Sequence, residues 1–391
     1  MTQEFRCPPR IITGDGSAET VGAHAAALRA TRTVVITDKT LHEKTDFVSA
    51  AVTSLKTSGL AVEVFDDVEP DPMVSTARRS AECYRAFRPD LVIGLGGGSA
   101  LDFAKATAAI LANERPLEEM WGVDNVPKPG LPTILMPTTA GTGSEVTPNS
   151  ILTDVKPDGG HTKKGIVSPH LLARTAIVDP LLTVTAPPHV TASAGMDALT
   201  HAIETYVSKS AQPLTRPLAL EAIRLIGSSL RRAVADGRDL EARSHMANAS
   251  LMAGLAFANG LLGGVHAIAM AMGGRFGVPH GVANALMLPY VMEFNETAVR
   301  EEYARIARAM GERVKGLPLH EAAHLASVAV HRLVVDVRLP HTLTDVKIPR
   351  GGIPGLAEES FGNQRLLKNN PRAATVQDIT GILEAASGAG G

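Results

Sequence analysis

The stretch DLVIGLGGGSALDFAK, residues 90–105, decides the fold of the first half of the chain. Residues 90–96 form a short apolar run that ends in glycines, as buried strands often do. The helical spacing of residues 99–113 begins directly after the glycines. A strand that passes through a glycine-rich loop into a helix is typical of a parallel sheet covered by helices.

Similar apolar runs recur on both sides of this stretch. They occupy residues 33–38, 61–68 and 175–180, and a fourth ends in the small-residue loop 137–145. A polar, arginine-rich segment at 73–87 has the character of an intervening helix. Alternation of this kind predicts an α/β domain with a mostly parallel sheet.

The second half of the chain has a different pattern, because its apolar spacing is helical throughout and offers no convincing strand. The boundary falls in the loop 183–191, where Pro187 and Pro188 interrupt regular structure. We therefore predict an N-terminal α/β domain at 1–185 and an all-helical C-terminal domain at 186–391.

Composition excludes several classes of function. The chain has 391 residues, with 38 Lys and Arg against 40 Asp and Glu, and a formal net charge of −2. This balance predicts no nucleic-acid partner, and the lack of an uncharged apolar run of about 18 residues predicts no membrane partner. The two cysteines, Cys7 and Cys83, are too few for a disulfide framework or a thiolate zinc cluster. With an N-terminus unlike a signal peptide, these features predict a cytoplasmic enzyme.

The glycine run is the first candidate binding site. Gly96, Gly97, Gly98 and Ser99 lie between a strand and a helix, where backbone N–H groups and the positive end of the helix dipole favour an anion. A phosphate or pyrophosphate suits this position, although the spacing matches neither the triphosphate P-loop nor the standard dinucleotide fingerprint. The alternative is a tight turn without a ligand.

Other polar residues of the first domain suit the same ligand. A second loop after a strand carries hydroxyl groups at Thr138, Thr139, Thr142 and Ser144. Asp38 ends an early strand, where a carboxylate can accept hydrogen bonds from a ribose diol and would repel a 2′-phosphate, which favours NAD over NADP. The alternatives are ordinary helix caps and turns.

The helical half contains residues that suit a metal ion. Asp197 and His201 are four residues apart, which places them on one face of a helix, while His266 and His280 come from later segments. Three imidazoles and one carboxylate suit Fe²⁺ or Zn²⁺ with one position left for a substrate oxygen. Taken singly, each residue could instead be a cap, a surface histidine or a hydrogen-bonded core histidine. Hydrolase motifs such as H-E-x-x-H and G-x-S-x-G are absent.

Taken together, these motifs resemble the iron-containing, or group III, alcohol dehydrogenases over nearly the whole chain, in particular the lactaldehyde/propanediol oxidoreductase branch. The resemblance is carried by GGGSALDFAK (96–105), PTTAGTGSEVT (137–147), GMDALTHAIETYVS (195–208) and VPHGVANALMLPYVMEFN (278–295), with further likeness in DPLLTVTAPP and NNPR.

The resemblance implies a dehydroquinate-synthase-like fold, with a dinucleotide-binding α/β domain and a metal-binding helical domain. It places Asp197, His201, His266 and His280 on the family's four metal positions, for Fe²⁺ or Zn²⁺. For NAD, it points to Asp38, Gly97, Gly98, Ser99, Asp102, Thr138, Thr139, Thr142, Ser144 and Lys163. It also implies a homodimer.

One position departs from the family pattern. Met270 stands where many members have a second histidine that faces the substrate, and a methionine thioether cannot carry a proton. The sequence therefore names no catalytic proton-transfer residue. A further hypothesis gives Arg275 a role in holding an anionic substrate group, such as a carboxylate.

The function implied is hydride transfer between NAD(H) and a small alcohol or aldehyde. The alternatives are a dehydroquinate-synthase-like lyase or a polyol dehydrogenase on the same fold, or an NAD-binding protein without catalytic activity.

Overall fold

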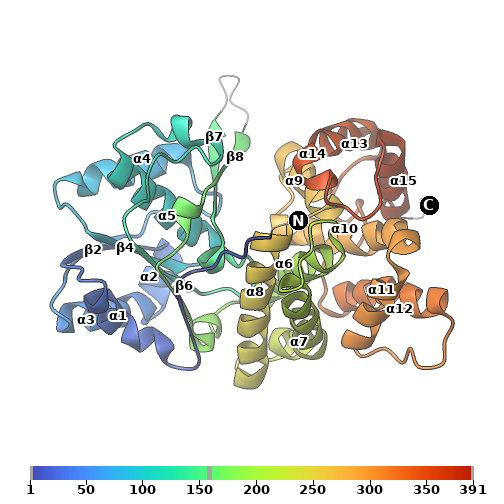
Figure 1. The fold of residues 1–391 in the computed structure, drawn as a ribbon, viewed down its shortest axis with the longest axis horizontal. Helices are drawn as coiled ribbons and strands as arrows, with labels where there is room; N and C mark the ends of the chain where they lie inside the picture. The colour runs from blue at the N-terminus through green and yellow to red at the C-terminus, as the bar shows by residue number, and fades with distance from the viewer. Residues whose placement is uncertain (1–2, 156–160, 389–391) are drawn as a thin grey trace. The chain divides into compact units, whose positions relative to one another are not determined.

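The computed structural model describes residues 3–155 and 161–388 and divides into two compact units (Figure 1). Residues 6–186 form the α/β unit, and residues 187–388 form the helical unit. The division falls between Ala186 and Pro187, at the proline pair. Residues 3–5 group with the helical unit, in contrast to the expectation that the α/β domain includes the N-terminal end.

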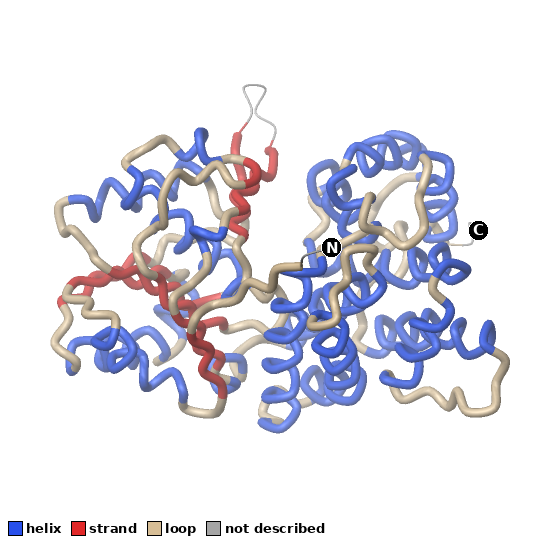
Figure 2. Tube along the Cα trace, viewed as in Figure 1, coloured by secondary structure: helices blue, strands red, loops and turns tan. Residues whose placement is uncertain are grey.

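A six-stranded parallel sheet forms the centre of the α/β unit, and Figure 2 shows its strands in red. Its strand order is β1-β9-β6-β4-β2-β3, and every neighbouring pair is parallel. The strands are β1 (Arg10–Thr13), β2 (Arg32–Ile36), β3 (Ala61–Phe65), β4 (Leu91–Gly96), β6 (Thr133–Pro137) and β9 (Thr175–Val178).

Helices cover both faces of this sheet (Figure 1). They are α1 (Val21–Ala27), α2 (Lys39–Lys44), α3 (Phe47–Thr57), α4 (Val74–Arg85) and α5 (Gly98–Asn113). Alternate residues of β4 enter different cores: Leu91, Ile93 and Leu95 pack with α1 and α3, while Val92 packs with α4 and α5. Burial on both faces explains why the sequence of this strand is continuously apolar.

A small second sheet in the same unit was not predicted from the sequence. It has the order β5-β8-β7, in which β7 and β8 are antiparallel. Its strands are β5 (Gly122–Val123), β7 (Asn149–Val155) and β8 (His161–Val167). The strand β1 of the main sheet was missed as well, because its four residues give too short an apolar pattern.

The helical unit contains no strand among its described residues, as the sequence predicts (Figure 2). Its main helices are α6 (Pro188–Val207), α7 (Thr215–Ala235), α8 (Leu240–Gly260), α9 (Gly264–Phe276), α10 (His280–Asn295), α11 (Arg300–Ala309), α12 (Leu319–Asp336), α13 (Ile353–Gly362), α14 (Gln364–Leu367) and α15 (Val376–Ala386). Helix α6 lies at the centre and packs against α7, α8 and α10.

Within the described residues, no helix taken singly has the length and apolarity to cross a membrane, although α8 and α9 together meet that test with a bend of 101° between them.

Candidate metal centre and cofactor loops

Helix α6 carries the first two candidate metal ligands. It begins at Pro188, whose fixed φ suits the first position of a helix. Most of its residues from Thr191 to Val207 are buried, so the polar Asp197 and His201 lie inside the unit at 3% and 4% exposure. Their spacing of four places both on one face, as predicted.

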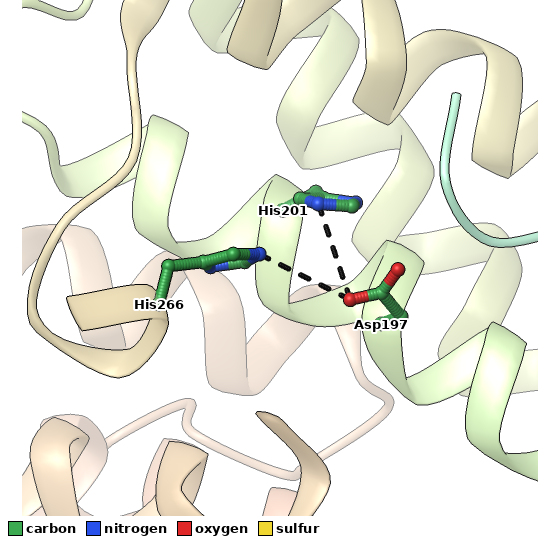
Figure 3. A group of neighbouring side chains, drawn as sticks. All are labelled: Asp197, His201 and His266. Atoms are coloured by element: carbon green, nitrogen blue, oxygen red, sulfur yellow. Dashed lines mark ion pairs between the residues drawn. The ribbon is translucent and has the colours of Figure 1, made fainter. Parts of the chain in front are cut away.

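Two other helices bring the remaining histidines to the same carboxylate. The Nε2 atoms of His201, His266 and His280 lie 3.9, 4.0 and 3.6 Å from Oδ1 of Asp197. Figure 3 shows His201 and His266 approaching that oxygen from separate helices. The structure therefore brings together four residues that span 197 to 280 in the sequence.

These distances fit a metal ion. In a tetrahedral site with bonds of 2.0–2.2 Å, neighbouring ligand atoms lie roughly 3.4 Å apart. Asp197, His201 and His266 offer ligand atoms that lie within 4.8 Å of one another, and Nε2 of His280 lies 3.6 Å from the Asp197 oxygen. Nitrogen and carboxylate donors suit Fe²⁺ and Zn²⁺ equally.

The amide of Asn284 marks the point on which the ligand atoms converge. Its Nδ2 lies 2.6 Å from Oδ1 of Asp197, 3.2 Å from Nε2 of His266 and 3.1 Å from Nε2 of His280. The Asp197 carboxylate and two of the imidazoles thus approach one atom from different helices. Within the described residues, the buried Oδ1 of Asn284 has no hydrogen-bond partner.

The electrostatics of the site keep the carboxyl group of Asp197 in its charged form. Burial alone raises the pKa of Asp197, but the charges of His201, His280 and His266 and the hydrogen bond from Asn284 hold that pKa below its usual value. The carboxylate is therefore ionised at neutral pH. The ring of His201 is also held in place by stacking on Phe257, with 4.3 Å between the centroids.

A glycine sets the distance between two of the ligand-bearing helices. Gly281 follows His280 at the start of α10, and a Cβ atom there would lie 2.5 Å from the backbone oxygen of Ser193 in α6. Only glycine therefore permits this approach of α10 to α6. The position of His280 relative to Asp197 depends on that approach.

Met270 and Arg275, the two other residues of α9 that the sequence analysis singled out, lie on different faces of the helix. Met270 follows His266 by four residues, so it lies on the same face of the helix, and it is partly exposed. Arg275 follows His266 by nine residues, which places it on the opposite face. A Cβ at Gly355 would meet the Arg275 guanidinium at 2.7 Å, so this group packs on α13. The hypothesis of substrate anchoring by Arg275 gains no support from this position.

In the α/β unit, the two predicted loops pack against each other. The glycine loop, Gly96 to Ser99, follows β4, and the threonine loop, Thr138 to Ser144, follows the neighbouring strand β6. A Cβ at Gly98 would lie 2.6 Å from the Thr142 side chain, and one at Gly97 would lie 3.7 Å from that of Thr139. The Thr138 N–H donates to the Gly96 carbonyl at 2.9 Å.

Asp102 ties both loops to the second sheet. Its Oδ1 accepts a hydrogen bond from Ser144, and its Oδ2 accepts one from the backbone of Ile151 at 2.9 Å. The buried Lys105 ammonium lies 3.0 Å from the same Oδ1 and donates to the Ser144 carbonyl. The contacts observed for Asp102 thus shape the loops.

The other predicted cofactor residues lie around the glycine loop. Asp38 is the N-cap of α2, where it accepts from the Leu41 N–H, and a Cβ at Gly96 would lie 3.8 Å from its Oδ2. Ser99 donates to the carbonyl of Pro70. Lys163 of β8 pairs with Asp71, the next residue after Pro70, at 2.8 Å.

Glu145, at the end of the threonine loop, is a buried carboxyl group that the sequence did not single out. It is 1% exposed. Burial raises its pKa to about 7, against the smaller lowering effects of its own backbone N–H and of Lys105.

Two further residues of the metal centre were also missed. Glu204 and Asn284 contact the candidate metal ligands His266 and Asp197, respectively. Glu204 follows Asp197 and His201 by seven and three residues, and Asn284 follows His280 by four, so helical spacing alone could have identified both.

Comparison with known proteins identifies the family. The family model described as iron-containing alcohol dehydrogenase matches residues 8–180, and the one described as Fe-containing alcohol dehydrogenase family, C-terminal, matches residues 191–387. The chain belongs to the iron-containing alcohol dehydrogenase family. It is accordingly an oxidoreductase of alcohols and aldehydes, and no finding favours a lyase or a protein without catalytic activity.

Individual members of the family are similar over their full lengths. The chain is 42% identical to long-chain-alcohol dehydrogenase 1 of Geobacillus thermodenitrificans, over 97% of this chain and 95% of that protein. The solved structure of a 1,3-propanediol oxidoreductase matches with a TM-score of 0.95 and 38% identity, over 99% and 100% of the two chains. That of a sulfoacetaldehyde reductase from Bifidobacterium kashiwanohense in complex with NAD⁺ matches with a TM-score of 0.87 and 32% identity, over 99% of each chain. The fold predicted from the sequence is thereby confirmed.

Proposed function

We propose that this iron-type alcohol dehydrogenase transfers a hydride between NAD(H) and a small alcohol or aldehyde, with Fe²⁺ or Zn²⁺ held by Asp197, His201, His266 and His280. The observation that carries the proposal is the approach of all three Nε2 atoms to one carboxylate oxygen, within 3.6–4.0 Å.

The cofactor loops provide a binding site for the dinucleotide. The N–H groups at the start of α5 and the positive end of its dipole attract the pyrophosphate, and Gly97 and Gly98 let the backbone approach it. The hydroxyl groups of Ser99, Thr139 and Thr142 are additional donors in this proposal. Asp38 accepts hydrogen bonds from the ribose diol.

Alcohol oxidation removes a proton from the hydroxyl oxygen and a hydride from the carbon, and NAD⁺ accepts the hydride to become NADH. When bound, the metal ion supplies positive charge that stabilises the negative charge developing on the substrate oxygen. Met270 cannot take the proton. The proton must then leave through water, the ribose hydroxyl groups of the cofactor or another residue.

The decisive experiment follows absorbance at 340 nm. Purified metal-free protein is mixed with NADH, a panel of short aldehydes and either Fe²⁺ under anaerobic conditions or Zn²⁺. The proposal expects oxidation of NADH that requires both the aldehyde and the metal. Full activity in the absence of metal, or NADH binding without turnover on any aldehyde or alcohol, would contradict it.

The cofactor preference has its own test. Replacing Asp38 with asparagine removes the negative charge that disfavours a 2′-phosphate. The ratio of kcat/KM for NADH to that for NADPH should then fall about tenfold, since a charged hydrogen bond is worth roughly 1.5 kcal/mol. An unchanged ratio would remove Asp38 from cofactor selection.

The proposal also includes the cytoplasm as the location and a homodimer as the assembly. The two cysteines, Cys7 and Cys83, are both unpaired, which suits a reducing compartment. Light scattering coupled to size-exclusion chromatography measures the assembly directly.

A further inference from the structure

The first turn of α9 contains His266, and its backbone N–H groups donate hydrogen bonds to side chains from other parts of the helical unit. Its opening N–H groups, those of Gly264 and Val265, cannot find acceptors inside the helix. The N-cap residue, Gly263, has no side chain with which to accept them. The acceptors are side chains from α6 and from the C-terminal region.

Glu204 of α6 supplies one of these acceptors. Its Oε1 accepts from the Val265 N–H at 2.6 Å, and its Oε2 lies 2.7 Å from Nδ1 of His266. The residue is only 6% exposed. A cavity of about 10 Å³ beside it has room for one water at most, so bulk solvent cannot replace either contact.

The contact with Nδ1 determines which nitrogen of His266 can bind a metal. A carboxylate oxygen at this distance accepts the hydrogen of Nδ1, so the contact places the ring proton on Nδ1. The unprotonated Nε2 then faces Asp197, at 4.0 Å, and accepts from Asn284, at 3.2 Å. This is the tautomer that a ligand through Nε2 requires.

Asn370, from the NNPR segment of the sequence, supplies the other acceptor. Its Oδ1 accepts from the Gly264 N–H at 3.2 Å, and its amide exchanges two hydrogen bonds with that of Asn295, at 3.0 and 2.7 Å. Its neighbour Asn369 donates to the Leu262 carbonyl at 3.0 Å. The C-terminal segment thus holds the chain on both sides of Gly263.

We propose that Glu204 is a positioning residue that caps α9 and holds His266 in its metal-binding tautomer, while Asn370 fixes the same turn. The proposal rests on the proposed metal centre. Glu204 does not touch the metal in this scheme; it acts only through His266. Carboxylate groups that orient histidine ligands in this way typically raise metal affinity 10–100-fold.

Replacing Glu204 with glutamine separates this role from packing, because the two side chains have the same shape. In Glu204→Gln, if the amide oxygen accepts from Val265, the NH₂ group faces Nδ1 and donates to it. The proton of the neutral ring then moves to Nε2, which blocks the metal. Zn²⁺ titration of the metal-free protein against a competing chelator should give a dissociation constant about 10–100-fold higher than in the wild type.

The tautomer itself is observable. In metal-free protein labelled with ¹⁵N-histidine, NMR should find the proton of His266 on Nδ1, and on Nε2 in Glu204→Gln. The variant His266→Ala assigns the signal. Glu312→Gln is the matched control, because Glu312 is also partly buried and ion-paired, to Arg332 at 3.0 Å. Its Zn²⁺ affinity should equal that of the wild type.

Two results would overturn the positioning role: wild-type Zn²⁺ affinity in Glu204→Gln, or a proton on Nε2 of His266 in the metal-free wild type. The second measurement decides the question even if the variant does not fold. The metal centre is judged separately by His266→Ala. Loss of Zn²⁺ binding there, with full binding in Glu204→Gln, removes the positioning role and leaves the proposed function intact.

Discussion

The metal centre and the cofactor loops are built in opposite ways. The proposed metal centre draws its side chains from three helices, and its outermost proposed ligands, Asp197 and His280, are 83 residues apart in the sequence. The loops proposed for the cofactor follow adjacent parallel strands, and their close packing depends on the missing side chain at Gly98. The metal centre therefore needs side chains of particular chemistry, whereas the cofactor loops need a particular backbone conformation.

The largest effect should come from removing a ligand at the first site. His266→Ala should lower turnover by at least about 1,000-fold, because the metal contributes several kcal/mol to the stabilisation of the reacting oxygen. Metal analysis of the purified variant should show loss of the ion. NADH binding, followed by fluorescence, should be unchanged because the cofactor loops lie in the other unit.

A variant that kept its metal and its turnover would refute the four-ligand site. Loss of NADH binding in the same variant would show that the metal centre and the cofactor loops depend on each other.

The two sites also differ in how much of each could be predicted from the sequence. The loop after β4 lies within one continuous motif, so its strand, glycines and helix were predicted with nearly the observed limits. The pairing of Asp197 with His201 also follows from helical spacing. Nothing in the spacing brings His266 or His280 to them, since this depends on how α9 and α10 pack on α6. The family resemblance supplied that step.

Other features were missed for physical reasons. In the small sheet, β5 has only two residues, and β7 and β8 carry many polar residues, so the sheet lacks the apolar pattern that identified the main sheet. Glu204 has helical spacing from Asp197 and His201, but the sequence analysis did not single it out, because a charged residue in a helix is usually exposed. Only the structure reveals that α9 begins beside it.

A second prediction concerns stability and pH in the α/β unit. The buried Glu145 carboxyl has its pKa raised to about 7, so the folded state binds its proton more tightly than the unfolded state does. The wild type should therefore lose stability as pH rises from about 4.5 through 7. Above pH 7 the loss is complete and amounts to about 3 kcal/mol.

Glu145→Gln removes this dependence, because its amide stays neutral. Urea unfolding of the full chain at several pH values should find the two proteins similar at low pH and the variant more stable above pH 7. If the free energies of unfolding of the two proteins differed by the same amount at every pH, ionisation of the buried Glu145 would cost no stability.

The smallest effect tests the backbone path of the glycine loop. In Gly98→Ala the new Cβ would lie 2.6 Å from the Thr142 side chain, so the two loops must separate slightly. Overpacking of this kind costs about 1–3 kcal/mol, which corresponds to a five- to 150-fold rise in the dissociation constant for NADH.

Zn²⁺ affinity should not change in Gly98→Ala. The double variant Gly98→Ala with Thr142→Ser, which removes the methyl group from the contact, should recover part of the NADH affinity. Wild-type NADH affinity in Gly98→Ala would mean that the dinucleotide does not need the close approach of the two loops.

The hydrogen bond from the Gly264 N–H to Asn370 also sets an order of events during protein synthesis. All four proposed metal ligands leave the ribosome before residue 370 does, whereas the α/β unit, which ends at residue 186, is complete much earlier. The nascent chain can thus form its cofactor loops during translation. Completion of the proposed metal site must wait until residue 370 has been made.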